Sequence, residues 1–249
     1  MSYRGGVDAV HFTSGGQRLV GVLYSAASAE PRPSLILLHG IPGTEKNYDI
    51  AYRLRDLGWH SLVVHFRGGW GSEGDYDMLA QPEDALAAVD YVLNTDAEWK
   101  VDAEHIAVLG FSLGNRAAIA AAYRDSRIGA VLSVAGFSDF DEVILSDEAY
   151  VNSAPFLHGT TARSLRTQWM KLADEDNPIS RIAQIECPIL IVHGTQDDTV
   201  PYWMAPALHE ASGKRAELEP IEDADHVFTQ HRAQLVGVVT NWLERWLTS

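Results

Sequence analysis

Short apolar runs alternate with helix-like patterns along nearly the whole chain of 249 residues. The apolar runs are almost continuous, which is typical of strands in a parallel sheet covered by helices on both faces. The first two runs flank the turn Ser14-Gly15-Gly16, which favours an antiparallel pair there. The strands are expected at residues 7–12, 19–24, 34–38, 59–66, 106–110, 128–134, 188–192 and 216–219. The pattern therefore predicts an α/β fold with a mostly parallel eight-stranded sheet flanked by helices.

Helical patterns occupy most of the intervals between these strands, at residues 49–57, 82–93, 205–211 and 230–247. Gly58 follows the first helix as a C-terminal cap residue, and Pro82 lies in the first turn of the second. The last helix ends in apolar residues that suit either packing on the sheet or a homodimer interface, and both alternatives stay open: Trp242, Leu243, Trp246 and Leu247.

One interval interrupts the alternation of strands and helices. Residues 137–187 contain no convincing strand, but have helix-compatible stretches at 141–146, 162–172 and 178–185. Structureless loops of this length are uncommon in compact domains. We predict that residues 137–187 form a small helical cap, inserted after the sixth strand, within a single domain that comprises residues 1–249. A disordered insertion is the alternative.

The composition limits the partners and the location of the protein. The net charge of -15 argues against nucleic acid or an anionic membrane as a partner, because both favour a basic patch. No apolar stretch reaches the ~18–20 residues that span a bilayer, and the first residues lack the apolar region of a secretion signal. The single cysteine, Cys187, excludes an internal disulfide and fits a reducing compartment. We therefore expect a cytoplasmic protein.

The pentapeptide G-x-S-x-G, with Ser112 at its centre, carries the strongest chemical signal. It follows the apolar run 106–109 and precedes the alanine-rich run 117–122. Strand, sharp turn and helix are the context of a nucleophile elbow, which holds a serine hydroxyl at the edge of the sheet. Gly110 and Gly114 lack a Cβ, so backbones can approach closely there. The N-terminus of the following helix carries a partial positive charge that suits an oxyanion.

A serine nucleophile needs a base, and the base needs an orienting carboxylate. In open α/β sheets, such groups lie beyond the carboxyl ends of the strands. Of the ten histidines, His226 lies in the loop between the last strand and the last helix, and Asp197 follows the seventh strand. The order Ser112, Asp197, His226 is the order of the hydrolase architecture that carries this elbow.

Four motifs span nearly the whole sequence: H-G-x-x-G at 39–43, F-R-G-G-W-G-S-E-G at 66–74, the elbow at 110–114, and H-G-x-x-D-x-x-V-P at 193–201 followed by D-H-x-F at 225–228. With these motifs the chain resembles the α/β-hydrolase superfamily, in its esterase and acyl-peptidase-like branch. The resemblance implies the α/β-hydrolase fold and acyl transfer by Ser112, Asp197 and His226. It also implies an oxyanion hole formed by the backbone N–H groups of Ile41 and Leu113.

Other residues have structural interpretations within the same resemblance. The spacing to Val200 favours Asp197 over the neighbouring Asp198 as the carboxylate of the triad. His39 and His193, at strand ends, are expected to support loops, and Arg67 to tie loops together. The remaining histidines show no paired ligand spacing such as H-x-x-x-H, so we expect no metal site and no cofactor. Asn115, where relatives often carry glycine or alanine, is expected to alter helix packing.

These inferences predict a serine esterase that acts on small-molecule carboxylic esters, including aryl or cinnamoyl-type esters. An aminopeptidase or acylaminoacyl-peptidase activity is the first alternative, and a non-catalytic binding protein of the same fold is the second. Apolar pockets suit such substrates. The aromatic residues expected to line the pocket, or else to pack the cap against the core, are Trp70, Phe111, Trp169 and Trp203, with Tyr150, Phe156 and Tyr202 nearby.

Overall fold

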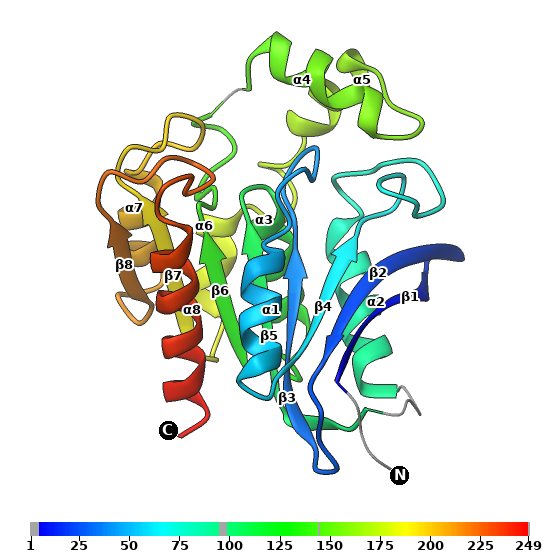
Figure 1. Cartoon of the computed structure of the whole chain (residues 1–249). Helices are drawn as coiled ribbons and strands as arrows, with labels where there is room; N and C mark the ends of the chain where they lie inside the picture. Colours follow the sequence, from blue (N-terminus) through cyan, green and yellow to red (C-terminus); the bar gives the residue numbers. More distant parts are fainter. Residues whose placement is uncertain (1–4, 95–98, 144, 249) are drawn as a thin grey trace.

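The computed structural model describes residues 5–94, 99–143 and 145–248. Its eight strands form one sheet in the order β1-β2-β4-β3-β5-β6-β7-β8 (Figure 1). The pairs β1–β2 and β2–β4 are antiparallel, and the other pairs are parallel. The strands are β1 (Gly6–Ser14), β2 (Gln17–Ser25), β3 (Arg32–Leu38), β4 (His60–His65), β5 (Val101–Phe111), β6 (Ala130–Val134), β7 (Ile189–Gly194) and β8 (Glu217–Ile221). This architecture confirms the mostly parallel eight-stranded sheet predicted from the sequence.

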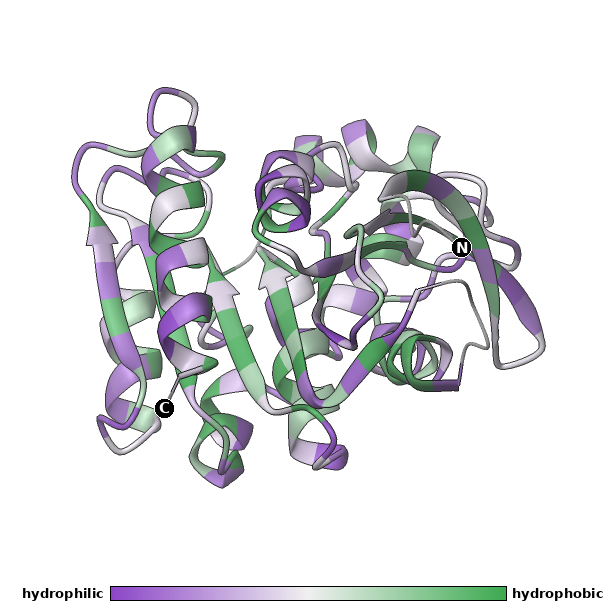
Figure 2. Ribbon diagram, turned by 60° about the horizontal axis from the view of Figure 1, so that its bottom comes forward, coloured by the Kyte–Doolittle hydropathy of each residue, from purple (hydrophilic) through white to green (hydrophobic). Residues whose placement is uncertain are grey.

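Helices cover both faces of the sheet, as Figure 1 shows for α1 (Tyr48–Asp56) and α8 (Arg232–Trp246) in front of it. Apolar residues of these two helices form one core cluster with one face of the strands. Helices α2 (Gln81–Asn94), α3 (Gly114–Arg124) and α7 (Met204–Ala211) contribute to a second cluster on the opposite face. Figure 2 shows the hydrophobic residues concentrated along the central strands between these layers. Of the two uses expected for the end of α8, packing on the sheet is observed, because Trp242 and Leu243 are buried there.

Among the described residues, five helical elements lie between β6 and β7: α4 (Asp147–Ser153), η1 (Ala154–Phe156), α5 (Ala162–Trp169), α6 (Pro178–Arg181) and η2 (Ile182–Gln184). Helices α4 and α5 lie above the carboxyl ends of the strands (Figure 1). The expected helical stretch at 141–146 is wrong for its described residues, while Ile144 lies outside the described ranges. The helix begins at Asp147 because the Ser146 hydroxyl accepts a hydrogen bond from the Ala149 N–H and caps the first turn.

A third apolar cluster joins this segment to the body of the protein. It contains Phe137, Tyr150, Leu165 and Trp169 of the segment together with Leu113, which follows the elbow serine. The boundaries predicted for the cap, 137–187, stay a prediction. Within the described ranges, none of the helices combines the length and the apolar character needed to traverse a lipid bilayer.

Candidate active site

Ser112 follows β5 directly and lies in the left-handed backbone region, at φ 53°. Few non-glycine residues adopt this conformation, because their Cβ crowds the backbone. The flanking glycines make the turn feasible: a Cβ on Gly110 would lie 2.4 Å from Gly114 O, and a Cβ on Gly114 would lie 2.3 Å from Leu38 O. A Cβ on Gly40 would lie 2.8 Å from the Ser112 Cβ. The three glycines thus allow two backbone segments to meet around one serine.

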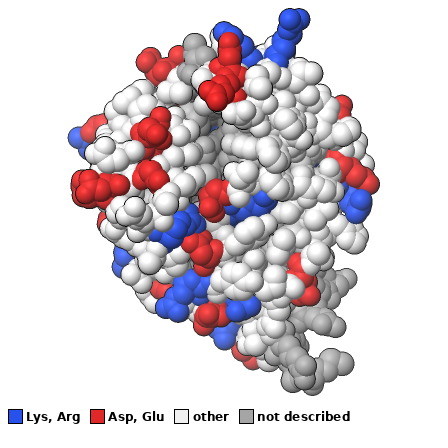
Figure 3. Space-filling model, turned by 45° about the horizontal axis from the view of Figure 1, so that its top comes forward, with Lys and Arg blue, Asp and Glu red and all other residues white. Residues whose placement is uncertain are grey.

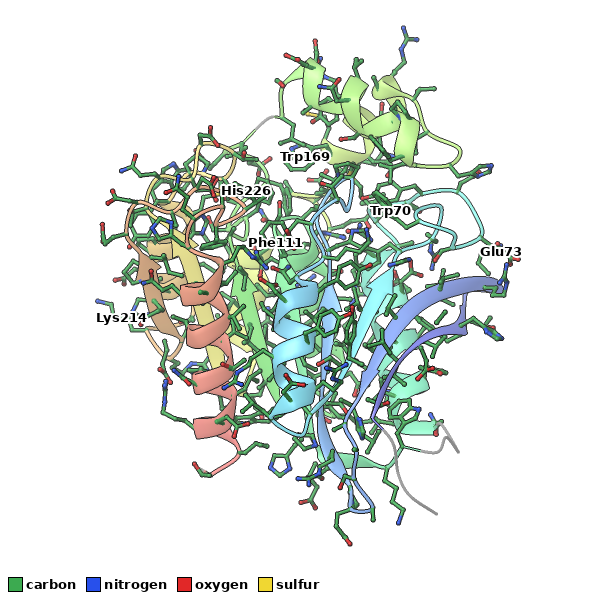
Figure 4. All side chains as sticks on the ribbon, in the orientation of Figure 1. Trp70, Glu73, Phe111, Trp169, Lys214 and His226 are labelled. Atoms are coloured by element: carbon green, nitrogen blue, oxygen red, sulfur yellow. The ribbon has the colours of Figure 1, made fainter. Side chains whose placement is uncertain are left out.

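The structure brings Ser112, His226 and Asp197 into one hydrogen-bonded line. His226 Nε2 lies 3.1 Å from Ser112 Oγ, and His226 Nδ1 lies 2.8 Å from Asp197 Oδ2. Ser112 and Asp197 are buried, and the His226 side chain is 14% exposed. Figure 4 shows His226 and Phe111 near the top of the sheet, below the segment that carries Trp169. In this arrangement an imidazole that donates Nδ1–H to the carboxylate can accept the serine proton at Nε2.

The Asp197 carboxylate is held by four donors. Its Oδ1 accepts from the N–H groups of Thr199 and Val200, at 2.9 and 2.8 Å. Its Oδ2 accepts from His226 and lies 3.2 Å from His193 Nε2. Burial alone would raise the pKa of Asp197, but the hydrogen bonds from His193, His226 and Val200 hold it well below its usual range. Among the described residues, the exposed Asp198 accepts only from the Thr199 hydroxyl, at 3.3 Å, whereas Asp197 contacts His226.

The backbone N–H groups expected to bind the oxyanion belong to Ile41, which lines the same pocket as Ser112, and to Leu113, which follows Ser112 in the chain. In the described part of the chain, neither N–H group donates to a protein acceptor. Leu113 lies at the N-terminus of α3, where the helix dipole favours negative charge.

A pocket of about 70 Å³ beside Ser112 has Ile41, Thr44, Glu45, Phe111 and Val227 among its walls. Figure 3 shows acidic and basic residues scattered over a mainly uncharged surface on this face of the molecule.

His39 holds the loop that carries Ile41. Its ring is buried, with Nδ1 2.7 Å from Gly40 O and Nε2 3.5 Å from the Phe66 N–H. These partners require a neutral ring that donates from Nδ1 and accepts at Nε2. Burial outweighs the hydrogen bond to Gly40 and lowers the pKa of His39 to about 3. His193 is also fully buried, and its Nε2 lies 2.8 Å from Val200 O in the Asp197 loop.

We expect His39 to make the stability of the protein pH-dependent in mild acid. The ordinary pKa of a histidine side chain is 6.5, and burial lowers the pKa of His39 to about 3 in the fold. Between these values the unfolded chain binds a proton that the folded chain does not bind. The free energy of unfolding should therefore fall as pH falls through this range, with a contribution of about 1.4 kcal/mol per pH unit.

The variant His39→Asn tests this expectation, because Asn donates to Gly40 O but does not titrate. Urea unfolding between pH 4 and 6.5 should show a shallower pH dependence in the variant by about one proton. Burial also lowers the pKa values of His60 and His65. Both residues are present in the wild type and in the variant, so they contribute equally to the pH dependence of the two proteins. An unchanged pH dependence would contradict the assignment, whatever the absolute loss of stability.

The four aromatic residues predicted to line a substrate pocket lie in different environments. Phe111 lines the pocket and its ring centroid lies 5.2 Å from that of His226. Trp169 is buried, donates Nε1–H to Val143 O and packs on Phe137, so it forms part of the apolar cluster. Trp203 is exposed before α7 and is not among the residues that line the pocket. Trp70 is exposed, and its indole N–H is already bonded to Pro42 O.

Sequence reasoning missed Lys46, which is buried near the pocket. Its ammonium donates to Gly43 O and lies 3.6 Å from the centroid of the Trp70 ring. Burial lowers the pKa of Lys46 to about 8, although Glu45 acts in the opposite direction. No local sequence pattern indicates that Lys46 is buried, because the ring that its ammonium contacts belongs to Trp70, in the loop after β4.

Other side chains fasten the elbow to its surroundings. Asn115 donates Nδ2–H to Phe137 O at 2.9 Å, and Arg116 donates to Met78 O and Glu175 O, so both tie α3 to neighbouring segments. Arg67 forms an ion pair with Asp84 of α2 and donates to Ser14 Oγ, and thus ties loops together. Among the described residues, no group of three or more His, Cys, Asp or Glu side chains could hold a metal ion.

Comparisons with known proteins bear on the family and the fold of the chain. The model of the prolyl oligopeptidase family matches residues 48–249. The quorum-quenching protein AidA of Acinetobacter baumannii (strain MDR-ZJ06) is 30% identical over 136 residues, which are 52% of this chain and 44% of that protein. The 2,6-dihydropseudooxynicotine hydrolase of Paenarthrobacter nicotinovorans is 26% identical over 200 residues, which are 79% of this chain and 53% of the hydrolase. The chain thus spans about half the length of these two relatives.

Among solved structures, Est1E from Butyrivibrio proteoclasticus, with ferulic acid bound, has a TM-score of 0.76 at 20% identity. The similarity covers 96% of this chain and 100% of the Est1E chain, and it shows a shared fold. The resemblance to α/β hydrolases inferred from the four motifs is therefore confirmed. Because the family match covers most of its length, this chain is an α/β hydrolase that belongs to the prolyl oligopeptidase family.

Proposed function

We propose that this protein is a serine hydrolase that cleaves carboxylic esters of small molecules through an acyl-enzyme on Ser112. The observation that carries the proposal is the line from Ser112 Oγ through His226 to Asp197, with contacts of 3.1 and 2.8 Å. Within the described residues, the backbone N–H groups of Ile41, which lines the same pocket as Ser112, and of the adjacent Leu113 have no protein acceptor. Nucleophile, base, orienting carboxylate and oxyanion donors are the parts that acyl transfer requires.

In the first step, Ser112 Oγ attacks the ester carbonyl carbon while its proton moves to His226 Nε2. The carbonyl oxygen becomes an oxyanion, which accepts hydrogen bonds from the amides of Ile41 and Leu113. The C–O bond to the alcohol then breaks, and His226 gives its proton to the departing oxygen. In the second step, water attacks the acyl-enzyme, loses a proton to His226, and the acid leaves as Ser112 recovers its proton.

Asp197 supports both steps without taking a proton. Its hydrogen bond keeps the Nδ1 proton on His226, so Nε2 is the nitrogen that can accept from Ser112. Its negative charge stabilises the imidazolium that forms in each step. The low pKa of Asp197, caused by its hydrogen bonds despite its burial, keeps this carboxylate ionised in the working range.

The pocket supports a small substrate. Its volume of about 70 Å³ suits a small acyl group such as acetyl. Phe111 beside His226 supplies an apolar wall. Est1E, which shares the fold, holds ferulic acid, and this likeness is the reason to include hydroxycinnamoyl esters among the substrates tested.

Amide hydrolysis is the second candidate, because the family that the chain matches is named for oligopeptidases. The same Ser112 chemistry would apply, with an amine in place of the alcohol as leaving group. A higher kcat/KM for aminoacyl p-nitroanilides than for short aryl esters would favour this candidate.

The test combines active-site labelling with a substrate panel. Intact mass after treatment with a fluorophosphonate should show one adduct, and peptide mapping should place it on Ser112. The panel contains p-nitrophenyl acetate, butyrate and octanoate, methyl ferulate and alanine p-nitroanilide. We expect the highest kcat/KM with p-nitrophenyl acetate. A folded protein that neither labels nor turns over any substrate would support the non-catalytic alternative and contradict the proposal.

A further inference from the structure

Two side chains hold the backbone immediately after Ile41. The indole N–H of Trp70 donates to Pro42 O at 2.6 Å, and the Lys46 ammonium donates to Gly43 O. The same ammonium lies 3.6 Å from the centroid of the Trp70 ring. A cation over an aromatic face is attracted by the ring quadrupole, and more strongly where water is excluded, as at the buried Lys46. Trp70 and Lys46 therefore act together on two successive carbonyls of the loop.

Trp70 itself is held in an unfavourable backbone conformation. Its φ of 54° lies in the left-handed region, which bulky residues seldom adopt. The Trp70 carbonyl lies 3.0 Å from His65 Nδ1, and its ring stacks on Phe156 with the planes 11° apart. Strained residues persist where the surroundings fix them, and they cluster at functional sites. The contacts of its carbonyl and its ring therefore hold Trp70 in this conformation and fix the direction of the indole.

The loop that carries Trp70 is anchored at its other end. The Ser72 hydroxyl accepts from the Val20 N–H at 2.9 Å and donates to His65 O at 2.7 Å, and Glu73 pairs with Arg18. The indole is thus presented from a loop fixed to β2 and β4. Figure 4 shows Trp70 and Glu73 on this loop, on the opposite side of the site from His226.

We propose that Trp70 and Lys46 are positioning residues that fix the Ile41 N–H in the direction of the oxyanion. This inference rests on the proposed function. An oxyanion donor meets full negative charge only in the transition state, so an error in its position lowers kcat more than it raises KM. Complete loss of one donor typically costs ~10²–10³ in kcat. Loosening a donor costs less, and we expect a loss of about 10- to 100-fold.

A structural role or a role in substrate binding would leave a different signature. If Trp70 were only a wall of the substrate site, its replacement would raise KM and leave kcat unchanged. If it only stabilised the loop, Tm would fall without a specific loss of kcat. A transition-state analogue separates these cases, because its affinity depends on the oxyanion donors.

The experiment compares Trp70→Phe and Lys46→Met with matched controls at pH 7. Trp70→Phe removes the indole N–H and keeps an aromatic ring, and Lys46→Met removes the charge and keeps the length. Trp59→Phe also removes an indole N–H hydrogen bond, the one that Trp59 donates to Glu244. Trp59 directly precedes β4, whereas Trp70 lies in the loop that follows this strand. Lys214→Met removes an exposed ammonium that pairs with Glu210 (Figure 4). Each protein is assayed for kcat and KM on p-nitrophenyl acetate, for Tm, and for Ki of phenyl trifluoromethyl ketone.

The ketone reports on the oxyanion site without ester turnover. Ser112 Oγ adds to its carbonyl carbon, the serine proton moves to His226, and the ketone oxygen becomes an oxyanion held by the two amides. We expect Trp70→Phe and Lys46→Met to lower kcat by about 10- to 100-fold, to change KM less than about threefold, and to raise Ki by the same factor as kcat falls. Both controls should match the wild type in kcat, KM and Ki, whereas Trp59→Phe should lower Tm because Trp59 is buried in the core.

Two outcomes would overturn the positioning role and leave the proposed function intact. One is a retained kcat in both variants, and the other is a raised KM with unchanged kcat and Ki. If Trp70→Phe fails to fold, Lys46→Met decides between the outcomes. Wild-type protein without turnover that depends on Ser112 would overturn the proposed function, and this inference with it. The failure of the function is therefore seen in the wild type, and the failure of the positioning role only in the variants.

Discussion

Replacement of Ser112 by Ala is expected to lower kcat for p-nitrophenyl acetate by about 10⁵- to 10⁶-fold. In serine hydrolases, loss of the nucleophile removes the acyl-enzyme route and leaves only what the oxyanion hole and binding supply. The substitution removes one oxygen and keeps the Cβ that packs against Gly40, so the turn at φ 53° should persist. The measurement is kcat for the variant, purified on fresh resin so that traces of wild type do not set the residual rate.

Ser133→Ala is a matched control for this experiment. Ser133 is a buried serine on β6 that pairs in register with Gly110, and its hydroxyl has no hydrogen-bond partner among the described residues. Its replacement should leave kcat within a few-fold of the wild type. A Ser112→Ala variant that keeps more than about 1% of the wild-type kcat would contradict the acyl-enzyme on Ser112, because the residual catalysis without a nucleophile is far smaller.

The core of the fold was predictable because its signals are local. The run that ends at Gly110 is apolar at every position, since β5 is covered on both faces at its carboxyl end. The alanine-rich run behind Ser112 is helical because small side chains allow α3 to pack against β5 and β6. The order of Ser112, Asp197 and His226 along the chain also predicted which loops would meet, because parallel strands present their carboxyl ends at one edge.

The less predictable parts depend on contacts that are distant in sequence. The helix expected at 141–146 begins instead at Asp147, where Ser146 provides a cap that the apolar pattern does not reveal. Trp169 looked like a candidate for a substrate wall, but its burial depends on Phe137 and Phe140. Lys46 carries no local signal, since its partner is the ring of Trp70 on another loop. A local sequence pattern predicts which side of a helix or strand is buried. It does not predict which residues, distant in sequence, will contact that side.

Asp197→Asn is expected to lower kcat by about 10⁴-fold, as the same change does in the serine-protease triad. In the wild type, Oδ1 accepts from the N–H groups of Thr199 and Val200, and Oδ2 faces His226 and His193. The two backbone donors require an oxygen at the Oδ1 position in the variant as well. The carboxamide NH₂ must therefore take the Oδ2 position, where it faces the ring nitrogens of both histidines.

This orientation forces the wrong tautomer on His226. An NH₂ group donates, so Nδ1 of His226 must accept and the ring proton moves to Nε2, which can then no longer take a proton from Ser112. Asp198→Asn is the matched control, because the one hydrogen bond of that exposed carboxylate to the described residues comes from the Thr199 hydroxyl, and the variant should keep kcat within a few-fold. The measurement is kcat for both variants, with Tm to show that they fold. If Asp198→Asn is the damaging change, the orienting carboxylate is not Asp197, and the chain of hydrogen bonds that carries the proposed function does not act in catalysis.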